Sequence, residues 1–347
     1  MSGGVDSSVA ALLLKEAGYD VVGVCLHLYS CNSTAAKSCC TAQDRIDARR
    51  VCEKLGIGFV SVDHRERFRT RVIEPFVEEY LRGRTPSPCI LCNRHLKFDV
   101  LFEEASRLGA SAIATGHYAR IEGAGDDVHR LMRGADSKKD QSYFLFTLSQ
   151  DQLRRIHFPL GDLTKQEVRR IAKKHGLPTS EKEESQEICF VPDGDYASFV
   201  ENKKPELVKG PGNFVKTDGT VVGRHRGIHN YTIGQRRGLG SGTGSRQYVV
   251  RIDALKNEVV LGTNDDLLRR ELIVGDIHWI ADKEAIDGRS NLAVQIRSAH
   301  SAAKADMELL SENAVRVIFE KPQRAIAPGQ AAVFYRGEEV VGGGWIE

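Results

Sequence analysis

The sequence predicts an α/β protein in which a parallel-sheet domain precedes a small β-rich central domain and a C-terminal β-barrel. In the first 200 residues, short apolar strands alternate with amphipathic helices, which is typical of a parallel sheet covered by helices. After about residue 200, glycines become frequent and short strands lie between turn residues, which indicates β structure. We therefore place the domains at residues 1–200, 201–268 and 269–347.

Strands and helices of the first domain follow from its apolar runs and from the glycines that bound them. An apolar run that stops at Gly18 predicts a helix, and the run that follows it predicts a buried strand. The same alternation continues as far as residue 115. The expected helices cover residues 9–17 and 46–55, and the expected strands cover residues 21–26, 58–62 and 112–115.

Four large side chains recur every four residues and mark one buried helical face. They are Phe68, Val72, Phe76 and Tyr80, a spacing that places all four on the same side of a helix. Pro75 lies inside this pattern and is expected to kink or restart the helix, because proline lacks an amide proton.

Two further helices are predicted in the first domain. One covers residues 92–108. The other begins at a capping box, in which Thr164 is followed three residues later by Glu167, and it ends at Gly176. In the second half of the chain, residues 247–252 and 331–335 are expected to be strands.

Bulk composition is that of a globular protein, with 41% hydrophobic and 28% charged residues. No apolar run approaches the roughly 18 residues that cross a bilayer, and no leader resembles a signal peptide. We therefore expect a cytoplasmic protein whose eight cysteines are thiols rather than structural disulfides.

The net charge is only +2, but residues 201–258 contain eleven Lys or Arg against five Asp or Glu. Such a basic stretch suits phosphate backbones, and a solvated surface without a partner remains the alternative.

The run Ser2-Gly3-Gly4-Val5-Asp6-Ser7-Ser8 leads directly into the first predicted helix. Its glycines let the backbone approach a ligand closely, and the helix N-terminus adds unpaired amides and a positive dipole end. No lysine follows at the spacing of a Walker loop. The run resembles the loop of the PP-loop ATP pyrophosphatases, which implies ATP binding and cleavage between its α- and β-phosphates. Mg²⁺ is expected with ATP, and Asp6 is its candidate ligand.

A loop of this kind normally follows a strand, yet only Met1 precedes it here. We therefore expect a further strand of roughly five or six residues before Met1 in the natural protein. An intact mass beginning at Met1 or Ser2 in the natural source would contradict this expectation.

Two cysteines stand out by their surroundings. Cys92 follows the proline loop Thr85-Pro86-Ser87-Pro88 and is expected in the first turn of a helix, with Arg94 and Lys97 nearby. A helix N-terminus and neighbouring cations both favour a thiolate. Cys189 lies far along the chain, between a charged loop and an apolar stretch.

Over essentially its whole length the chain resembles the bacterial tRNA-specific 2-thiouridylases. The resemblance is carried by motifs in one order, which include the loop at residues 2–8, Gly83-Arg84-Thr85-Pro86, Ala114-Thr115-Gly116-His117-Tyr118, Lys139-Asp140-Gln141-Ser142-Tyr143-Phe144, Glu187-Ile188-Cys189-Phe190, Tyr231-Thr232-Ile233-Gly234-Gln235-Arg236 and Ala327-Pro328-Gly329-Gln330.

This resemblance implies which residues carry the sulfur and which residues bind ATP or tRNA. Cys189 would carry a persulfide, and Cys92 would first transfer a proton and then attack that persulfide, leaving a Cys92–Cys189 disulfide. The residues implied to bind ATP are Ser2, Gly3, Gly4, Val5, Asp6, Ser7, Leu26 and Gly116. The residues implied to bind tRNA are Ser87, Pro88, Cys89, His117, Lys139, Asp140, Gln141, Arg297, Ser298 and Gln330.

Two departures from the family pattern concern the RNA-binding segments. Ser87 stands where the family usually has Asn, and residues 240–246 differ from the usual motif.

The implied reaction is ATP-dependent 2-thiolation of the wobble uridine of tRNA, in which the 2-oxygen is adenylated and then replaced by sulfur. The implied partners are tRNA and a sulfur-donor protein, either a cysteine desulfurase or a sulfur-relay carrier, and the chain is expected to act as a monomer without a membrane.

Three alternatives to tRNA 2-thiolation through a persulfide remain. The same activity could use a [4Fe-4S] cluster on Cys89, Cys92 and Cys189. The chain could be another PP-loop ligase or amidotransferase, which would need neither the two cysteines nor the basic β region. It could be a non-catalytic RNA-binding module, against which the intact nucleotide loop argues.

Overall fold

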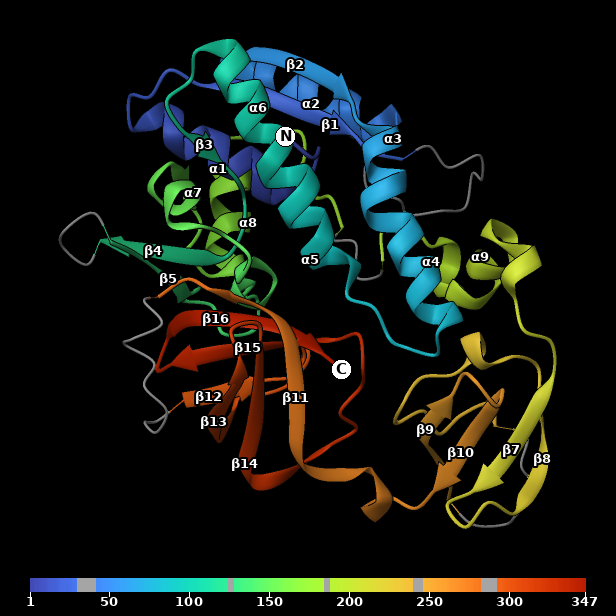
Figure 1. The fold of residues 1–347 in the computed structure, drawn as a ribbon. Helices are drawn as coiled ribbons and strands as arrows, with labels where there is room; N and C mark the ends of the chain where they lie inside the picture. The colour runs from blue at the N-terminus through green and yellow to red at the C-terminus, as the bar shows by residue number, and fades with distance from the viewer. Residues whose placement is uncertain (30–41, 124–127, 184–187, 240–245, 282–291) are drawn as a thin grey trace. The chain divides into compact units, whose positions relative to one another are not determined.

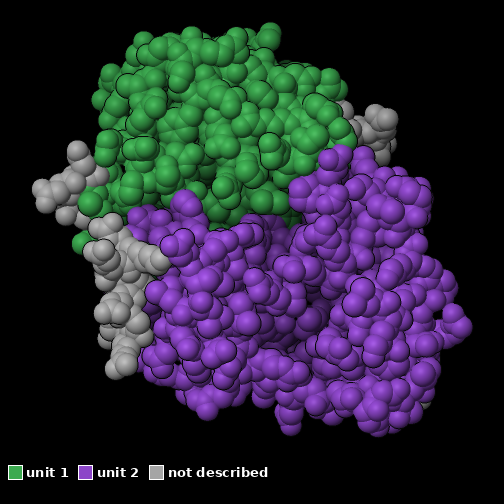
Figure 2. Space-filling view, in the orientation of Figure 1, with its two compact units in different colours: residues 1–72, 88–194, 338–341 green, residues 73–87, 195–337, 342–347 purple. Residues whose placement is uncertain are grey.

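A computed structural model describes residues 1–29, 42–123, 128–183, 188–239, 246–281 and 292–347. The chain divides into two compact units (Figure 2). Unit 1 comprises residues 1–72, 88–194 and 338–341, and unit 2 comprises residues 73–87, 195–337 and 342–347. The predicted fold class is confirmed, because an α/β region with parallel strands precedes a β-rich region and a closed barrel. None of the helices in the described ranges has the length and hydropathy needed to cross a membrane.

Unit 1 contains two pairs of parallel strands. β1 (Val22–His27) pairs with β2 (Gly58–Asp63), and β3 (Ile113–Ala114) pairs with β6 (Ile156–His157). Both pairs are parallel, as predicted, but within the described residues they form two separate two-stranded sheets. The amino group of Met1 donates a hydrogen bond to a carbonyl of β1. The expected strand before Met1 stays a prediction.

Three helices of unit 1 share one hydrophobic core (Figure 1). They are α1 (Val5–Glu16), α2 (Ala42–Leu55) and α8 (Lys165–Lys174). Val9, Val51 and Val168 lie in this core with no exposed surface. The predicted capping box at the start of α8 is confirmed, because Thr164 and Glu167 each accept a hydrogen bond from the other's backbone amide.

The helical face predicted from Phe68 to Tyr80 is confirmed, since its four large side chains are at most 5% exposed. The segment is built from α3 (Arg65–Phe68), a π-helical turn η1 (Arg69–Ile73) and α4 (Glu74–Leu81). Pro75 lies in the first turn of α4, directly after the π-helical turn. The irregularity that the proline was expected to cause therefore takes the form of a widened turn.

The second predicted helix is α5 (Pro88–Cys92), a π-helical turn η2 (Asn93–Phe98) and α6 (Asp99–Leu108). Its predicted start at Cys92 was wrong by four residues, because the helix begins at Pro88. Proline suits the first helical position, where its missing amide proton is not needed. Cys92 is therefore the last residue of α5, and the amides of a helix N-terminus favour its thiolate less than predicted.

An antiparallel hairpin in unit 1 was not predicted. β4 (Ala119–Gly123) pairs with β5 (His129–Arg133), and β5 also pairs with Glu339 and Val340 at the start of β16 (Glu339–Ile346). This last partner is about 200 residues away in sequence, so no local pattern indicates it. The other short elements of unit 1 are η3 (Ser142–Leu145), α7 (Gln150–Arg154) and η4 (Pro192–Gly194).

Unit 2 contains a helical pair and a four-stranded sheet. α9 (Tyr196–Lys203) packs on α4, and the rings of Tyr80 and Tyr196 stack with centroids 4.5 Å apart. The sheet has the order β8-β7-β10-β9 and its own buried core. Its strands are β7 (Gly212–Lys216), β8 (Val221–His225), β9 (Tyr248–Asp253) and β10 (Glu258–Gly262), and the short helices nearby are η5 (Pro205–Leu207) and η6 (Ile228–Asn230).

The remaining strands close a barrel, because β11 pairs with both β14 and β16. Glycines allow this closure: a Cβ at Gly344 would lie 2.5 Å from the carbonyl oxygen of Gly275 on β11. The strands predicted at residues 247–252 and 331–335 are confirmed as β9 and β15. The barrel elements are η7 (Asp265–Leu267), β11 (Leu268–Trp279), β12 (Leu292–Gln295), β13 (Ala303–Ser311), β14 (Ala314–Arg324), β15 (Ala331–Arg336) and β16.

Candidate nucleotide and RNA site

The loop before α1 has a shape that only small residues allow. Gly3 has a φ of 71°, and a Cβ there would lie 2.2 Å from the carbonyl oxygen of Asp44. The hydroxyl of Ser7 accepts a hydrogen bond from the amide of Ser2 at 3.1 Å and donates to the carbonyl of Gly4 at 3.2 Å. The loop therefore curls over the first turn of α1, with its short polar side chains next to the helix N-terminus.

Asp6 lies in the first turn of α1. Two residues that were not predicted to belong to the site, Lys165 and Tyr118, contact its side chain. The Lys165 ammonium lies 2.7 and 2.8 Å from its two carboxylate oxygens. The Tyr118 hydroxyl donates to one of them at 2.7 Å. Tyr118 belongs to a motif that we singled out, but no local signal in the sequence pairs either residue with Asp6.

Gly116 and Leu26, both predicted to contact ATP, also lie in unit 1. A Cβ at Gly116 would be 2.8 Å from the carbonyl carbon of Asp6 and 2.9 Å from the amide nitrogen of Ser7. Gly116 therefore packs directly on the first turn of α1. Leu26 is the penultimate residue of β1 and is 9% exposed. ATP binding by these residues stays a prediction.

Gln141, predicted to contact tRNA, is tied to the same network. Its amide donates to the carbonyl of Tyr118 at 2.9 Å, and its side-chain oxygen accepts from the amide of Tyr118 at 3.1 Å. Because the Tyr118 hydroxyl reaches Asp6, one residue joins a predicted RNA contact to the predicted nucleotide loop. Lys139 lies two residues before Gln141 and is half-buried.

Asp140, also predicted to touch tRNA, has a side chain only 7% exposed. Its carboxylate accepts hydrogen bonds from the Arg133 guanidinium at 2.6 Å, from the amides of Gly134 and Ser142 at 3.0 Å each, and from the Ser142 hydroxyl at 3.0 Å. These bonds fold the loop that carries Lys139 and Gln141. The geometry of Asp140 therefore suits positioning of that loop.

His117 is 6% exposed and lies between aromatic rings. Its ring stacks on Phe98 with centroids 5.8 Å apart. Burial, and secondarily the charge of Lys97, hold the pKa of His117 well below its usual 6.5. A neutral ring whose Nε2 accepts from Lys97 at 3.4 Å carries its proton on Nδ1, which then donates to the Thr115 hydroxyl at 2.8 Å. A direct contact of this side chain with RNA stays a prediction.

The two predicted catalytic cysteines, Cys92 and Cys189, are both half-buried residues of unit 1. Cys92 ends α5 and is followed directly by the π-helical turn η2. Cys189 lies in a turn, and the next residue, Phe190, packs edge-on against Phe68 of α3 with ring centroids 5.5 Å apart. Part of the motif before Cys189 (residues 184–187) lies outside the described residues.

Cys89, the third cysteine of the iron–sulfur alternative, is an exposed free thiol. In the described ranges, no three side chains among His, Cys, Asp and Glu are gathered closely enough to hold a metal ion. The alternative of an iron–sulfur cluster on Cys89, Cys92 and Cys189 stays a prediction.

The predicted RNA contacts of unit 2 are held by glutamine amides. The side chain of Gln330 donates to the carbonyls of Thr85 and Pro86 at 3.0 and 3.1 Å, and thereby brings the loop before Ser87 to the barrel. Ser87 itself is 9% exposed, and Pro88 after it is buried. The loop that leads to Ser87 and the side chain of Gln330, both predicted to contact tRNA, are thus in contact within unit 2.

A second glutamine, Gln295, was not predicted and acts in the same way. It is 5% exposed, and its side-chain amide donates to the carbonyls of Arg297 and Ser298 at 3.2 and 3.1 Å. The side chain of Ser298 is exposed and that of Arg297 half-buried. The amide of Gln295 therefore shapes the turn that presents them.

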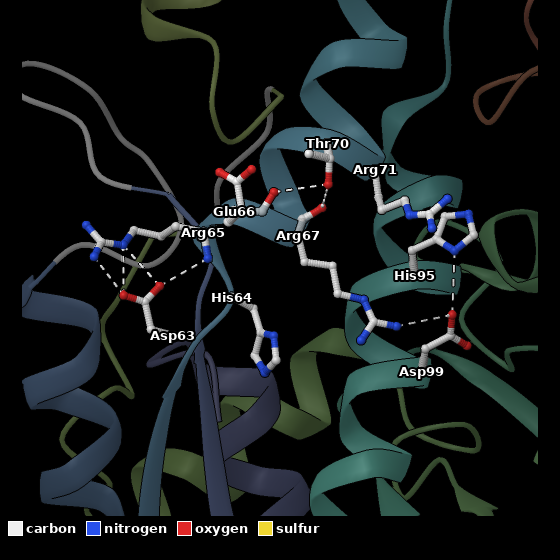
Figure 3. A pocket seen from close by; sticks show the side chains of 9 residues that line it. All are labelled: Asp63, His64, Arg65, Glu66, Arg67, Thr70, Arg71, His95 and Asp99. Carbon is white, nitrogen blue, oxygen red and sulfur yellow. Dashed lines mark hydrogen bonds and ion pairs between the residues drawn. The ribbon is translucent and has the colours of Figure 1, made fainter.

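A surface cavity of about 860 Å³ lies in unit 1, and none of the residues predicted for the site lines it (Figure 3). Two of its three arginines are paired locally: Arg65 with Asp63 at 2.7 Å, and Arg67 with Glu103 at 2.7 Å. The bond with Arg65 holds the pKa of Asp63 below its usual range. The residues that line the cavity are Asp63, His64, Arg65, Glu66, Arg67, Thr70, Arg71, His95 and Asp99.

Three protein-family models match consecutive parts of the chain. The model described as "tRNA methyl transferase HUP domain" matches residues 1–193, "tRNA methyl transferase PRC-barrel domain" matches residues 198–263, and "Aminomethyltransferase beta-barrel domain" matches residues 269–346. The boundaries predicted at residues 200 and 268 remain predictions.

Similar proteins cover the whole chain. The tRNA-specific 2-thiouridylase MnmA of Geobacter metallireducens is 47% identical over 357 residues, which is 100% of this chain and 95% of that protein. The protein of the same name from Carboxydothermus hydrogenoformans is 49% identical and covers 100% of this chain and 96% of its own length. The protein of the same name from Acidithiobacillus ferrooxidans is 44% identical and covers 100% of this chain and 97% of its own length.

The chain belongs to the tRNA-specific 2-thiouridylase family. The resemblance identified from its motifs is thereby confirmed. The 2-thiouridylase family is one of enzymes that modify tRNA, and its PP-loop domain corresponds to the region that holds the loop at residues 2–8.

Proposed function

We propose that the chain catalyses ATP-dependent 2-thiolation of the wobble uridine of tRNA, with sulfur carried as a persulfide on Cys189. One observation carries the proposal: Tyr118 joins Asp6 of the nucleotide loop to Gln141 of the predicted RNA loop by hydrogen bonds of 2.7 to 3.1 Å. The relatives named above are tRNA-specific 2-thiouridylases, which supports the same reaction. Two of the family models are described as methyl transferases, but adenylation fits a PP-loop and methyl transfer does not require one.

Adenylation comes first, because the 2-oxygen of uracil is a poor leaving group. The 2-oxygen forms a bond to the α-phosphorus of ATP, and the bond from that phosphorus to the α,β-bridging oxygen breaks. Its electron pair leaves with pyrophosphate, and the uracil N3 proton passes to solvent. The loop amides and the N-terminus of α1 stabilise the negative charge that develops on the phosphates.

Sulfur transfer follows at C2. The terminal sulfur of the Cys189 persulfide gives up its proton to Cys92 and adds to C2, and the C2–O bond breaks as AMP leaves with the electron pair. After Cys92 has lost that proton to solvent, its thiolate attacks Cys189 Sγ. The sulfur–sulfur bond breaks, the transferred sulfur stays on C2, and N3 regains a proton. The resulting Cys92–Cys189 disulfide is cleaved by a thiol reductant before the sulfur donor reloads Cys189.

The thiols suit this role, because a thiolate is present to a useful degree near pH 7 without a strong base. An unpaired anticodon base can also enter a pocket at a cost of only a few kcal/mol. We propose the cytoplasm as the site of this reaction, since both thiols must stay reducible.

Asp6 is the residue that would hold Mg²⁺, because carboxylate oxygens are ligands this ion prefers. When bound, the ion would neutralise phosphate charge. The carboxylate already contacts Lys165 through both oxygens, so the two cations would share it. The persulfide route needs no iron–sulfur cluster, and no step is assigned to one.

The test is thiolation of unmodified tRNA with ATP and a persulfide donor, with nucleosides analysed by mass. Cys189→Ser and Cys92→Ser should each lower 2-thiouridine formation at least about a thousandfold, while tRNA-dependent pyrophosphate release continues. Cys52→Ala is the matched control, since Cys52 is a fully buried thiol of α2 and its loss should leave thiolation in place. Substantial thiolation by either serine variant would refute the role assigned to that cysteine.

Anaerobic purification separates the persulfide route from the iron–sulfur alternative. We expect a colourless protein that thiolates tRNA. A brown protein whose activity follows its iron content would overturn the persulfide route.

A further inference from the structure

Lys97 lies in the π-helical turn η2, five residues after Cys92. In an α-helix it would lie about 140° around the axis from Cys92. The hydrogen bonds of a π-helical turn link residues five apart, so the wider turn brings Lys97 back towards the side of Cys92. Asn93, which is 2% exposed, donates from its side chain to the carbonyl of Phe144 at 3.0 Å and thereby fastens this turn to η3.

The ammonium of Lys97 acts on two predicted RNA contacts. It lies 3.4 Å from Nε2 of His117, which is neutral because burial, and secondarily the charge of Lys97, hold its pKa well below 6.5. His117 therefore accepts a hydrogen bond without neutralising the charge. Desolvation of the thiol raises the pKa of Cys89, an exposed residue as a whole, and the charge of Lys97 opposes that rise. One positive charge thus serves the predicted RNA contacts His117 and Cys89 and follows the predicted catalytic Cys92.

Other half-buried lysines of the chain are matched by acids. Lys204 pairs with Glu78 at 2.9 Å, and Lys182 pairs with two carboxylates at 2.6 and 2.7 Å. Lys97 is also half-buried, but among the described residues no carboxylate forms an ion pair with it. Because burial of an unmatched charge costs free energy, a positive charge held beside a neutral ring and two thiols suits an anion that forms during the reaction.

We propose that Lys97 is a catalytic residue that stabilises the negative charge formed on the target base during sulfur transfer. The inference rests on the function proposed above and deepens it by naming the cation of that step. When the persulfide sulfur adds to C2, the electron pair of the C2–N3 double bond moves to N3, and it returns as AMP leaves with the C2–O pair. When the Cys92 thiolate then attacks Cys189 Sγ, the pair of the broken sulfur–sulfur bond moves to the sulfur on C2. The base is then anionic across this sulfur and N3 until N3 takes a proton, and an ammonium that donates a hydrogen bond to it lowers its energy.

Removal of the charge in the full-length protein tests this directly. Lys97→Gln should lower kcat for 2-thiouridine formation at least about a hundredfold, while the KM for tRNA and tRNA-dependent pyrophosphate release change little. Lys97→Met, which keeps the length of the side chain without its charge, should show the same loss. Lys97→Arg keeps the charge and should retain at least about a tenth of the activity. Lys174→Gln is the matched control, since Lys174 is an exposed lysine of α8, and it should thiolate tRNA at the wild-type rate.

A tRNA with 5-fluorouridine at the target position separates an effect on the base from an effect on the fold or on the thiols. Fluorine withdraws electrons and stabilises an anionic base without help from the protein. The loss caused by Lys97→Gln should therefore be at least about threefold smaller on this tRNA than on the uridine tRNA. An equal loss on both tRNAs, or thiolation by Lys97→Gln at the wild-type rate, would overturn the inference and leave the proposed function standing. Wild-type protein that forms no 2-thiouridine would overturn both.

Discussion

Two carboxylates of unit 1, Asp6 and Asp140, are held in contrasting ways. Asp140 accepts four hydrogen bonds from three residues near it in sequence and is 7% exposed. Asp6 is 32% exposed, and its partners Lys165 and Tyr118 come from distant parts of the chain.

The difference shows how one chemical group serves two purposes. A carboxylate surrounded by backbone amides and a guanidinium has its acceptor capacity used and fixes a loop. A partly exposed carboxylate in the first turn of a helix can still accept another cation. Asp140 therefore suits structure, and Asp6 suits ligand binding.

The largest effect should come from Asp6→Asn. Without the negative charge the site loses its candidate Mg²⁺ ligand, and tRNA-dependent pyrophosphate release should fall at least about a hundredfold. The free energy of unfolding should fall by only about 1–2 kcal/mol, because the pair is partly exposed to solvent. Pyrophosphate release and denaturant unfolding check the two expectations. An unchanged rate of release would contradict the role of Asp6.

Asp140→Asn should have the opposite effect, and lower the free energy of unfolding more than it lowers the rate of pyrophosphate release. It removes the charge from a buried carboxylate with four hydrogen bonds, and the free energy of unfolding should fall by about 2–4 kcal/mol. Pyrophosphate release per folded molecule should fall much less than in Asp6→Asn, since the Asp140 carboxylate bonds Arg133, Gly134 and Ser142. Denaturant unfolding and active-site titration check this. If Asp140→Asn is fully stable but inactive, the distinction between the two carboxylates fails.

His117 precedes Tyr118, which joins the predicted nucleotide loop to a predicted RNA contact. The effect of His117 should be smaller and depend on pH. Burial lowers its pKa below 6.5 in the folded protein, so below pH 6.5 the unfolded chain binds a proton that the folded chain does not. His117 should therefore reduce stability as pH falls below about 6.5, by at most about 1.4 kcal/mol per pH unit. His117→Gln should remove this slope. Urea unfolding at pH 7 and pH 5.5 compares the two proteins, and equal slopes would show that His117 charges readily in the folded state.

Much of the local structure could be predicted from the sequence. The capping box of Thr164 and Glu167 depends on three-residue spacing, and the buried face from Phe68 to Tyr80 depends on helical periodicity. The loop at residues 2–8 depends on glycines and on the helix that follows it. The start of α5 was misplaced, because a proline loop and a helix that begins at proline have the same local sequence.

The sequence by itself thus determined many of the elements, the loop before the first helix and the family, because each rests on short-range spacing or on motif order. Only the tertiary structure decided which side chains meet. Lys165 reaches Asp6 across 159 positions and Gln330 reaches Thr85 across 245. Such contacts follow from how α1, α8 and the barrel pack within their units, and packing depends on burying many apolar surfaces at once. No spacing along the chain carries that information.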